Sequence, residues 1–217
     1  MSVLSKLIYF PLQVLFIPAA IVGAMLVAYK QLVVSKRLRP SQTAVEVING
    51  RCTMHIFGLR KDDATAKLAA ALPNTALPGV WLALFPLWVQ HKLSGKQFLY
   101  PKVAKLGAEK LGDMMISRTL YCDQVLERVI GDAGKVVLVG AGYDTRAYGP
   151  LRTEDVAWFE LDQKSVQDHK RAMLAQAGID AVSTIFVTVD FSQDDVFEKL
   201  GSAGFDPNVK TVFLWRE

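Results

Sequence analysis

The sequence predicts an α/β protein with a doubly wound parallel sheet of about four strands, preceded by a helical region and an apolar N-terminal segment. Two observations predict the sheet. Short runs of β-branched and aromatic residues alternate with helical stretches in the second half of the chain, and a glycine-rich turn follows the first run. A third observation, a long uncharged run near the start, predicts a membrane helix. We expect three parts, at residues 1–40, 41–116 and 117–217.

The N-terminal apolar run covers residues 7–29 and contains no charged side chain. At about 1.5 Å per residue, a helix of that length crosses a hydrocarbon core of about 30 Å, so a single transmembrane helix is expected. Lys6 precedes the run and four basic residues follow it by Arg39, which favours a cytoplasmic position for the rest of the chain. A cleaved signal peptide and a buried or interfacial helix are the alternatives.

A second apolar stretch, residues 76–89, is too short to span a bilayer. Trp81 and Trp88 suit a membrane interface, and packing in a protein core explains them equally well. Between the two stretches, residues 43–71 read as helical, and further helices are expected at 103–115 and 117–131.

The charges are divided unevenly along the chain. Residues 1–110 hold 14 of the 25 Lys and Arg but only 4 of the 21 Asp and Glu, although the net charge is only +4. Because the basic residues gather beside an apolar run, we expect a lipid membrane as the acidic partner and not nucleic acid. The hydrophobic share of 51% excludes a disordered chain.

Metal and redox chemistry find no support in the sequence. Cys52 and Cys122 lie far apart and have no Cys-x-x-Cys spacing, so two free thiols are favoured over one disulfide. The three histidines are isolated from one another. No metal site is therefore expected.

The predicted strands place candidate ligand-binding residues at one edge of the sheet. Residues 135–139 form a buried strand that leads into the turn containing Gly140 and Gly142, where the missing Cβ atoms let a ligand approach the backbone. The next strand, residues 156–161, ends at Asp162, the position where such a sheet places a carboxylate on a ribose diol. Helices at 165–177 and 193–200 and strands at 184–189 and 211–215 complete the pattern.

Two nucleoside cofactors compete for this edge. A dinucleotide site requires a third glycine, where this chain has Thr145, and a carboxylate such as Asp144 near the helix N-terminus of such a site would repel a pyrophosphate. The cationic methyl donor S-adenosyl-L-methionine carries no phosphate and is favoured over NAD. Asp144 either caps a turn or contacts the ligand.

Several motifs occur together and in order: Arg118 and Thr119 with Asp123, GAGYDTR at 140–146, FELD at 159–162, Asp190 with Phe191, and a strand closing at Glu217. This combination resembles the leucine carboxyl methyltransferase-like family of S-adenosyl-L-methionine-dependent methyltransferases. The resemblance covers residues 118–217 and, more faintly, the chain from about residue 43.

The resemblance implies a Rossmann-like class I methyltransferase sheet and a role for each matching residue. Arg118 would pair with the carboxylate of the methionine part, Asp162 would hold the ribose, and Gly140 and Gly142 would allow close approach. The remaining implied contacts are Asp190 with the adenine amino group, Phe191 as an apolar wall and Glu217 at the methionine end. Glu160 is expected to support the strand end, and the alternative for Arg118 is a surface salt bridge.

The resemblance also implies the reaction. The acceptor would be a carboxylate or another small molecule; a carboxylate is already ionised at neutral pH, so no catalytic acid or base is assigned. Because sheets of this family have more strands than the chain supplies, we expect a C-terminally truncated form with low stability and little activity of its own. A catalytically inactive, membrane-associated nucleoside-binding or interaction module and, less favoured, an NAD-dependent oxidoreductase are the alternative functions.

Overall fold

The computed structural model describes residues 3–38, 42–96 and 111–215. The chain divides into two compact units. The first contains Met1–Lys61 and Leu72–Ile116, and the second contains Asp62–Ala71 and Ser117–Glu217. A short segment near the middle of the sequence thus folds with the C-terminal half.

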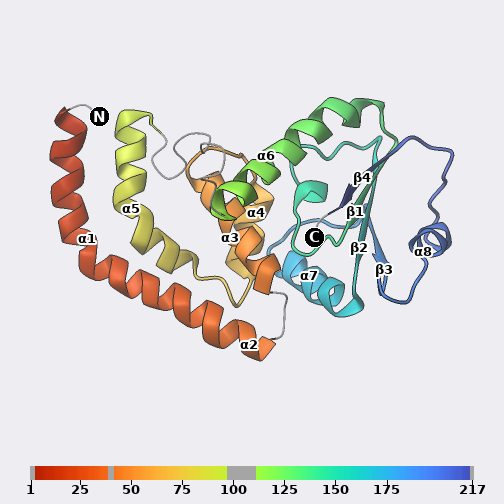
Figure 1. The fold of residues 1–217 in the computed structure, drawn as a ribbon, viewed down its shortest axis with the longest axis horizontal. Coiled ribbons are helices and arrows are strands. Elements are labelled where there is room, and N and C mark those ends of the chain that lie inside the picture. The colour runs from red at the N-terminus through yellow and green to blue at the C-terminus, as the bar shows by residue number, and fades with distance from the viewer. Residues whose placement is uncertain (1–2, 39–41, 97–110, 216–217) are drawn as a thin grey trace. The chain divides into compact units, whose positions relative to one another are not determined.

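The N-terminal part of the first unit is one continuous run of helix. It consists of α1 (Val3–Tyr29), the π-helical turn η1 (Lys30–Val34) and α2 (Ser35–Leu38). The helix expected at residues 7–29 is thus present, and Figure 1 shows that α1 bends. Pro11 and Pro18 explain the bend, because each removes a helical hydrogen bond.

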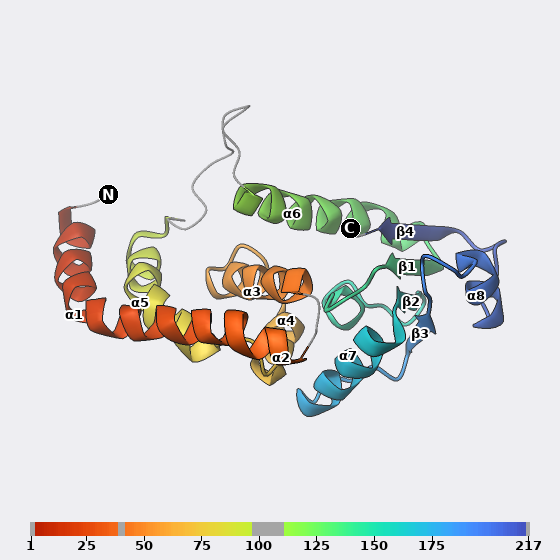
Figure 2. The ribbon, with the colours of Figure 1, turned by 60° about the horizontal axis from the view of Figure 1, so that its bottom comes forward.

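The second apolar stretch, except for Ala76, lies within helix α5 (Leu77–Ser94), which packs along α1. Figures 1 and 2 both show the two helices side by side. Their backbones meet at Gly23 and Gly79, where a Cβ on Gly23 would lie 2.4 Å from the carbonyl oxygen of Gly79. Phe16 and Phe85 stack farther along, with ring centroids 4.9 Å apart. The apolar residues 76–89 therefore pack against another helix of the same chain.

The helical expectation for residues 43–71 needs a correction, because two helices occupy this range. Helix α3 (Gln42–Ile56) ends before Gly58, whose φ of 71° is accessible to glycine at little cost. Helix α4 (Asp63–Ala71) begins after Asp62, whose side chain accepts a hydrogen bond from the amide of Thr65. A turn and a new N-cap separate the two helices.

The two helices expected at 103–115 and 117–131 also need a correction. Helix α6 (Leu111–Val129) runs through the expected break, and residues 103–110 lie outside the described residues. No glycine or proline occurs between residues 113 and 129, so nothing ends the helix there. The turn η2 (Ile130–Asp132) then leads to the sheet.

The second unit is built on a four-stranded, wholly parallel sheet in the order β3-β2-β1-β4. Its strands are β1 (Lys135–Val139), β2 (Ala157–Asp162), β3 (Thr184–Thr188) and β4 (Thr211–Trp215), and its connecting helices are α7 (Lys164–Gln176) and α8 (Val196–Ser202). All five residues of β1 are buried, as expected of a central parallel strand. The strand order reverses direction between β1 and β4, the position where open α/β sheets bind ligands.

Helices cover both faces of this sheet. Val136 and Leu138 pack with Leu126 of α6 on one face, while Val137 and Val139 pack with Leu200 of α8 on the other. The alternation follows from the two-residue period of a strand. The α/β fold with a parallel four-stranded sheet, predicted from the sequence, is confirmed.

Candidate active site

The turn after β1 and the end of β2 form one connected structure. Gly140 and Gly142 adopt φ values of 65° and 47°, so the chain turns where side chains would be strained. The Gly142 amide donates to Oδ2 of Asp162 at 2.6 Å, and the Gln163 amide donates to Oδ1 at 2.8 Å. Two backbone amides therefore orient the Asp162 carboxylate at the carboxyl end of the sheet.

Asp190 and Phe191 lie beyond the end of the neighbouring strand β3. The amide of Val189 donates to the carbonyl of Asp162 at 3.0 Å, which joins this segment to the end of β2. The Ser192 hydroxyl and amide donate to Oδ1 of Asp190 at 2.7 and 3.0 Å and lower the pKa of that carboxyl. The structure thus brings the segment with Asp190 to the same edge as Asp162, with Phe191 41% exposed beside it.

Arg118 and Glu217 are the two other residues expected at the site. Arg118 lies on α6 with an exposed side chain, next to Thr119, whose carbonyl accepts a hydrogen bond from Arg146. Glu217 lies outside the described residues. The glycine turn, Asp162 and the Asp190 segment are therefore the part of the expected site that the structure assembles.

The loop after the glycines holds a short 3-10 turn, η3 (Arg146–Tyr148), where a dinucleotide motif would begin an α-helix. Asp144 is fully buried, and its Oδ2 lies 2.6 Å from Nη1 of Arg146. Asp144 therefore lies in a turn beside a buried arginine and not at the N-terminus of an α-helix. Its carboxylate also accepts from the Arg146 amide at 2.9 Å, so Asp144 shapes the turn.

Comparison with known proteins decides the family. The family model for leucine carboxyl methyltransferase matches residues 84–216. The chain belongs to the leucine carboxyl methyltransferase family. The motifs at 118–123, 140–146, 159–162 and 190–191 all lie inside the matched range, so the predicted family is confirmed.

Curated relatives in mycobacteria carry proposed names that agree with this family. A proposed S-adenosyl-L-methionine-dependent methyltransferase of Mycobacterium ulcerans is 36% identical over 110 residues, 50% of this chain and 35% of the relative. Proteins with the same proposed name are 30% identical over 166 residues in Mycolicibacterium paratuberculosis and 40% identical over 142 residues in Mycobacterium sp. strain KMS. These matches cover 76% and 64% of the chain but only 51% and 45% of the relatives. The chain therefore spans between about a third and half of the length of the relatives it matches.

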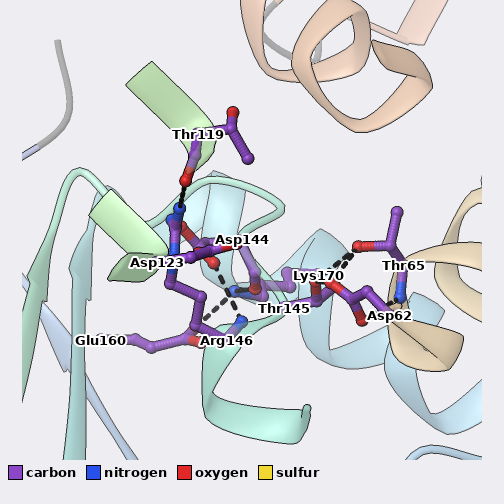
Figure 3. Close-up of polar contacts among 9 residues, drawn as sticks. All are labelled: Asp62, Thr65, Thr119, Asp123, Asp144, Thr145, Arg146, Glu160 and Lys170. Atoms are coloured by element: carbon purple, nitrogen blue, oxygen red, sulfur yellow. Dashed lines mark hydrogen bonds and ion pairs between the residues drawn. The ribbon is translucent and has the colours of Figure 1, made fainter. Parts of the chain in front are cut away.

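This leucine carboxyl methyltransferase family member holds its loop with a buried arginine whose role the sequence analysis did not anticipate. Arg146 contacts Asp144, and its Nε lies 2.6 Å from Oδ1 of Asp123 on α6 (Figure 3). Burial alone would lower the pKa of the Arg146 guanidinium, but the two carboxylates raise it above its ordinary value. The shared occurrence of Asp123 and Arg146 in the family motifs was the available signal.

Thr145 ties the same loop to helix α4. Its hydroxyl donates to Oδ2 of Asp62 at 2.7 Å and lies 2.6 Å from the hydroxyl of Thr65 (Figure 3). Thr145 and Thr65 are fully buried, and Asp62 is 1% exposed. The residue that replaces the third glycine of a dinucleotide motif is therefore a structural anchor in this family member.

A buried ion pair supports the other side of the loop. Nζ of Lys170 on α7 lies 2.6 Å from Oε2 of Glu160 and donates to the carbonyl of Asp144 at 2.7 Å. Burial raises the pKa of the Glu160 carboxyl, and the charge of Lys170 opposes that shift. Glu160 thus supports the strand and loop, as expected, and does not face the ligand edge.

Tyr143 connects the loop to α7 through a fourth contact. Its hydroxyl lies 2.8 Å from Nδ1 of His169. Burial, with a smaller contribution from the charge of Asp162, raises the pKa of Tyr143 to about 12, and burial lowers the pKa of His169. Both groups are therefore uncharged at neutral pH, and the pair acts as a neutral hydrogen bond.

Proposed function

We propose that the chain carries the cofactor-binding part of an S-adenosyl-L-methionine-dependent methyltransferase that is attached to a membrane. The observation that carries the proposal is the Asp162 carboxylate, oriented by two backbone amides beside the glycine turn. An ionised carboxylate has lone pairs left after these two bonds and can accept from both hydroxyls of a ribose. Family membership points to the same cofactor.

The geometry of the loop favours a nucleoside without a diphosphate. Dinucleotide sites place the pyrophosphate on the N-terminus of an α-helix, where free amides and the helix dipole attract it. Residues 140–150 contain only the 3-10 turn η3, so no α-helix N-terminus is available there for a pyrophosphate. S-adenosyl-L-methionine therefore fits this edge better than NAD does.

The proposed contacts follow the family motif position by position. Asp162 binds the ribose, while Gly140 and Gly142 leave room for the backbone to approach the cofactor. Asp190 accepts from the adenine amino group, and the exposed ring of Phe191 covers the base. Arg118 pairs with the methionine carboxylate, and Glu217 contributes at the methionine end.

The chemistry proposed for the site is transfer of a methyl group to a carboxylate or another small acceptor. When bound, S-adenosyl-L-methionine supplies a methyl group activated by its sulfonium. A carboxylate acceptor is ionised at neutral pH and needs no general base, so the residues of this chain bind, orient and exclude water. No residue is assigned as a catalytic acid or base.

Calorimetric titration with S-adenosyl-L-methionine and with NADH tests the cofactor. The purified chain is expected to bind the first and not the second, and Asp162→Ala is expected to weaken binding at least about tenfold, because a charge-assisted contact is lost. Asp168→Ala removes an exposed carboxylate of α7 and serves as the matched control. Unchanged affinity in Asp162→Ala would contradict the proposed site.

A transfer assay tests the reaction and the acceptor class. Cell extract is incubated with the chain and a cofactor labelled in its methyl group, and the products are treated with alkali. A methyl ester hydrolyses to volatile labelled methanol, whereas methyl ethers and methylamines keep the label. Binding without any transfer would favour the alternative of a non-catalytic nucleoside-binding module.

Membrane attachment is proposed to occur through α1. By length and composition alone, Leu7–Val34 could cross a membrane. Its most apolar 18 residues have a mean hydropathy of 2.2, and only 6% of that stretch is buried within the protein. The basic residues that follow the apolar run favour a cytoplasmic position for the second unit. Retention in the membrane pellet after carbonate washing is the expected result, and release would contradict attachment.

A further inference from the structure

Helices α1 and α5 pack antiparallel to each other. Gly23 near the C-terminal end of α1 meets Gly79 near the N-terminal end of α5, and Phe16 stacks on Phe85. A Cβ on either glycine would lie within 2.7 Å of the opposite carbonyl oxygen, so the two backbones touch. Such contact between small residues is typical of helices that pack within a bilayer.

Both ends of α5 lie on the same side of any membrane. The chain leaves the second unit after Ala71, passes through α5 and re-enters the second unit at Ser117. Residues 95–116 contain six charged side chains and no apolar run long enough to cross a bilayer. Helix α5 therefore does not span.

The packing of α1 on α5 places both ends of α1 on that same side of the membrane. At its C-terminal end, Lys30 donates to the carbonyl of Pro73 at 2.6 Å, and Asn74 donates to the Ser35 hydroxyl at 3.3 Å, so this end lies at the start of α5. Figures 1 and 2 both show the N-terminal part of α1 beside the C-terminal part of α5. Each end of α1 is therefore next to an end of α5.

An upright α1 would place polar groups in the hydrocarbon. From Gly79 to Lys92, α5 rises about 20 Å. If α1 crossed the bilayer and α5 packed alongside it, His91 and Lys92 would therefore lie deep in the hydrocarbon. Lys92 is exposed and lies over the ring of Trp88 at 5.7 Å, an arrangement suited to the headgroup layer.

We propose that α1 and α5 form a monotopic membrane insertion, in which neither helix crosses the bilayer and both ends of α1 face the compartment of the second unit. The occupant of the exposed α1 surface is lipid hydrocarbon. Side chains that expose more than half of their surface share the face of α1 that points away from α5, among them Phe10, Val14, Leu15, Ile21, Val22 and Met25. This topology differs from the single pass expected from length and hydropathy, and it rests on the proposed membrane attachment.

Cysteine labelling on sealed vesicles distinguishes the two topologies. In a chain carrying Cys52→Ala and Cys122→Ala, Ser2→Cys and Lys36→Cys place single thiols beyond the two ends of α1. A membrane-impermeant maleimide is expected to label both from the cytoplasmic face of inside-out vesicles and neither from intact spheroplasts. Labelling of the two thiols from opposite faces would overturn the monotopic topology and leave membrane attachment standing.

Crosslinking tests the helix pair itself. A short bifunctional maleimide is expected to join Phe16→Cys to Phe85→Cys within one chain in membranes. Val14→Cys with Phe85→Cys is the matched control, because residue 14 lies two positions away, on the opposite side of α1, and is 63% exposed. Equal crosslinking of the control, or crosslinks only between chains, would overturn the pairing. Recovery of the chain in the carbonate supernatant would overturn attachment and insertion together.

Discussion

The amide of Gly142 donates to Oδ2 of Asp162 at 2.6 Å, so the glycine turn itself orients the carboxylate proposed to hold the cofactor. Val139 and Leu161 are register partners on the adjacent strands β1 and β2, which brings both residues to the same edge of the sheet. The position of the carboxylate therefore depends on the backbone of the turn. A change that alters the turn should affect cofactor binding without touching Asp162.

Gly142→Ala tests this dependence. At a φ of 47°, an added Cβ strains the backbone, and we expect a loss of stability of about 1 kcal/mol together with weaker binding of S-adenosyl-L-methionine. Urea unfolding and calorimetric titration measure the two effects. Gly178→Ala is the matched control, because Gly178 has a φ of 64°, has open space at its Cβ position and follows α7. The control should lose similar stability and keep its affinity; equal loss of affinity in both variants would refute the coupling.

Arg146→Met should strongly destabilise the second unit. Arg146 is 2% exposed and its guanidinium faces Asp144 and Asp123, so its removal leaves carboxylates without their buried counterion, at a cost of about 3–5 kcal/mol. Urea unfolding followed by tryptophan fluorescence measures the change. Lys164→Met removes an ion pair with the same 2.6 Å separation but with exposed side chains, so its effect should stay below about 1 kcal/mol. Similar losses in the two variants would show that burial does not decide the outcome.

Lys170→Met should make stability depend on pH. Burial already raises the pKa of Glu160, and loss of the lysine charge raises it further above its value in the unfolded chain. The stability tied to protonated Glu160 is then fully present below the unfolded pKa and is lost as the pH rises through the folded pKa. The variant should therefore unfold more readily at pH 8 than at pH 5. Adding Glu160→Gln should remove this slope, and a slope that persists in the double variant would assign it to another group.

Much of the sheet could be predicted from the sequence because its signals are local. Residues 135–139 and 211–215 form strands with the predicted bounds, since short apolar runs bounded by turn residues are typical of buried strands. Asp162 and the Asp190 segment meet at one edge because parallel strands bring their carboxyl ends together. These predictions needed only the order of the strands along the chain and the assumption that the strands are parallel.

The supporting contacts could not be predicted, because they join distant positions. Asp62 and Thr145 are 83 residues apart, and no periodicity indicates that α4 would dock on the glycine loop. Asp144 and Arg146 carry opposite charges in an exposed-looking turn, yet both are buried. A sequence pattern indicates which face of a helix or strand is apolar, whereas the pairing of buried charges depends on tertiary packing.

Helix α5 shows the same limit. The apolar stretch 76–89, nearly all of which lies in α5, fits a membrane interface and a protein core equally well, and its length excludes only a span. The face of α5 that packs on α1 includes Gly79, whose lack of a Cβ lets the two backbones approach. Only the structure relates Gly79 to Gly23.

Thr145→Gly restores the spacing of a dinucleotide motif and is expected to bind no NADH. The variant reads Gly-x-Gly-x-x-Gly at 140–145, but the following residues form the turn η3, so no α-helix N-terminus meets a pyrophosphate. It should also unfold more readily by about 1–3 kcal/mol, because the buried Asp62 loses the hydroxyl that donates to it at 2.7 Å. NADH fluorescence and urea unfolding measure the two effects, with Thr145→Ser expected to stay near the wild type because it keeps the hydroxyl. NADH binding by Thr145→Gly would show that the missing glycine, and not the missing helix, excludes the dinucleotide.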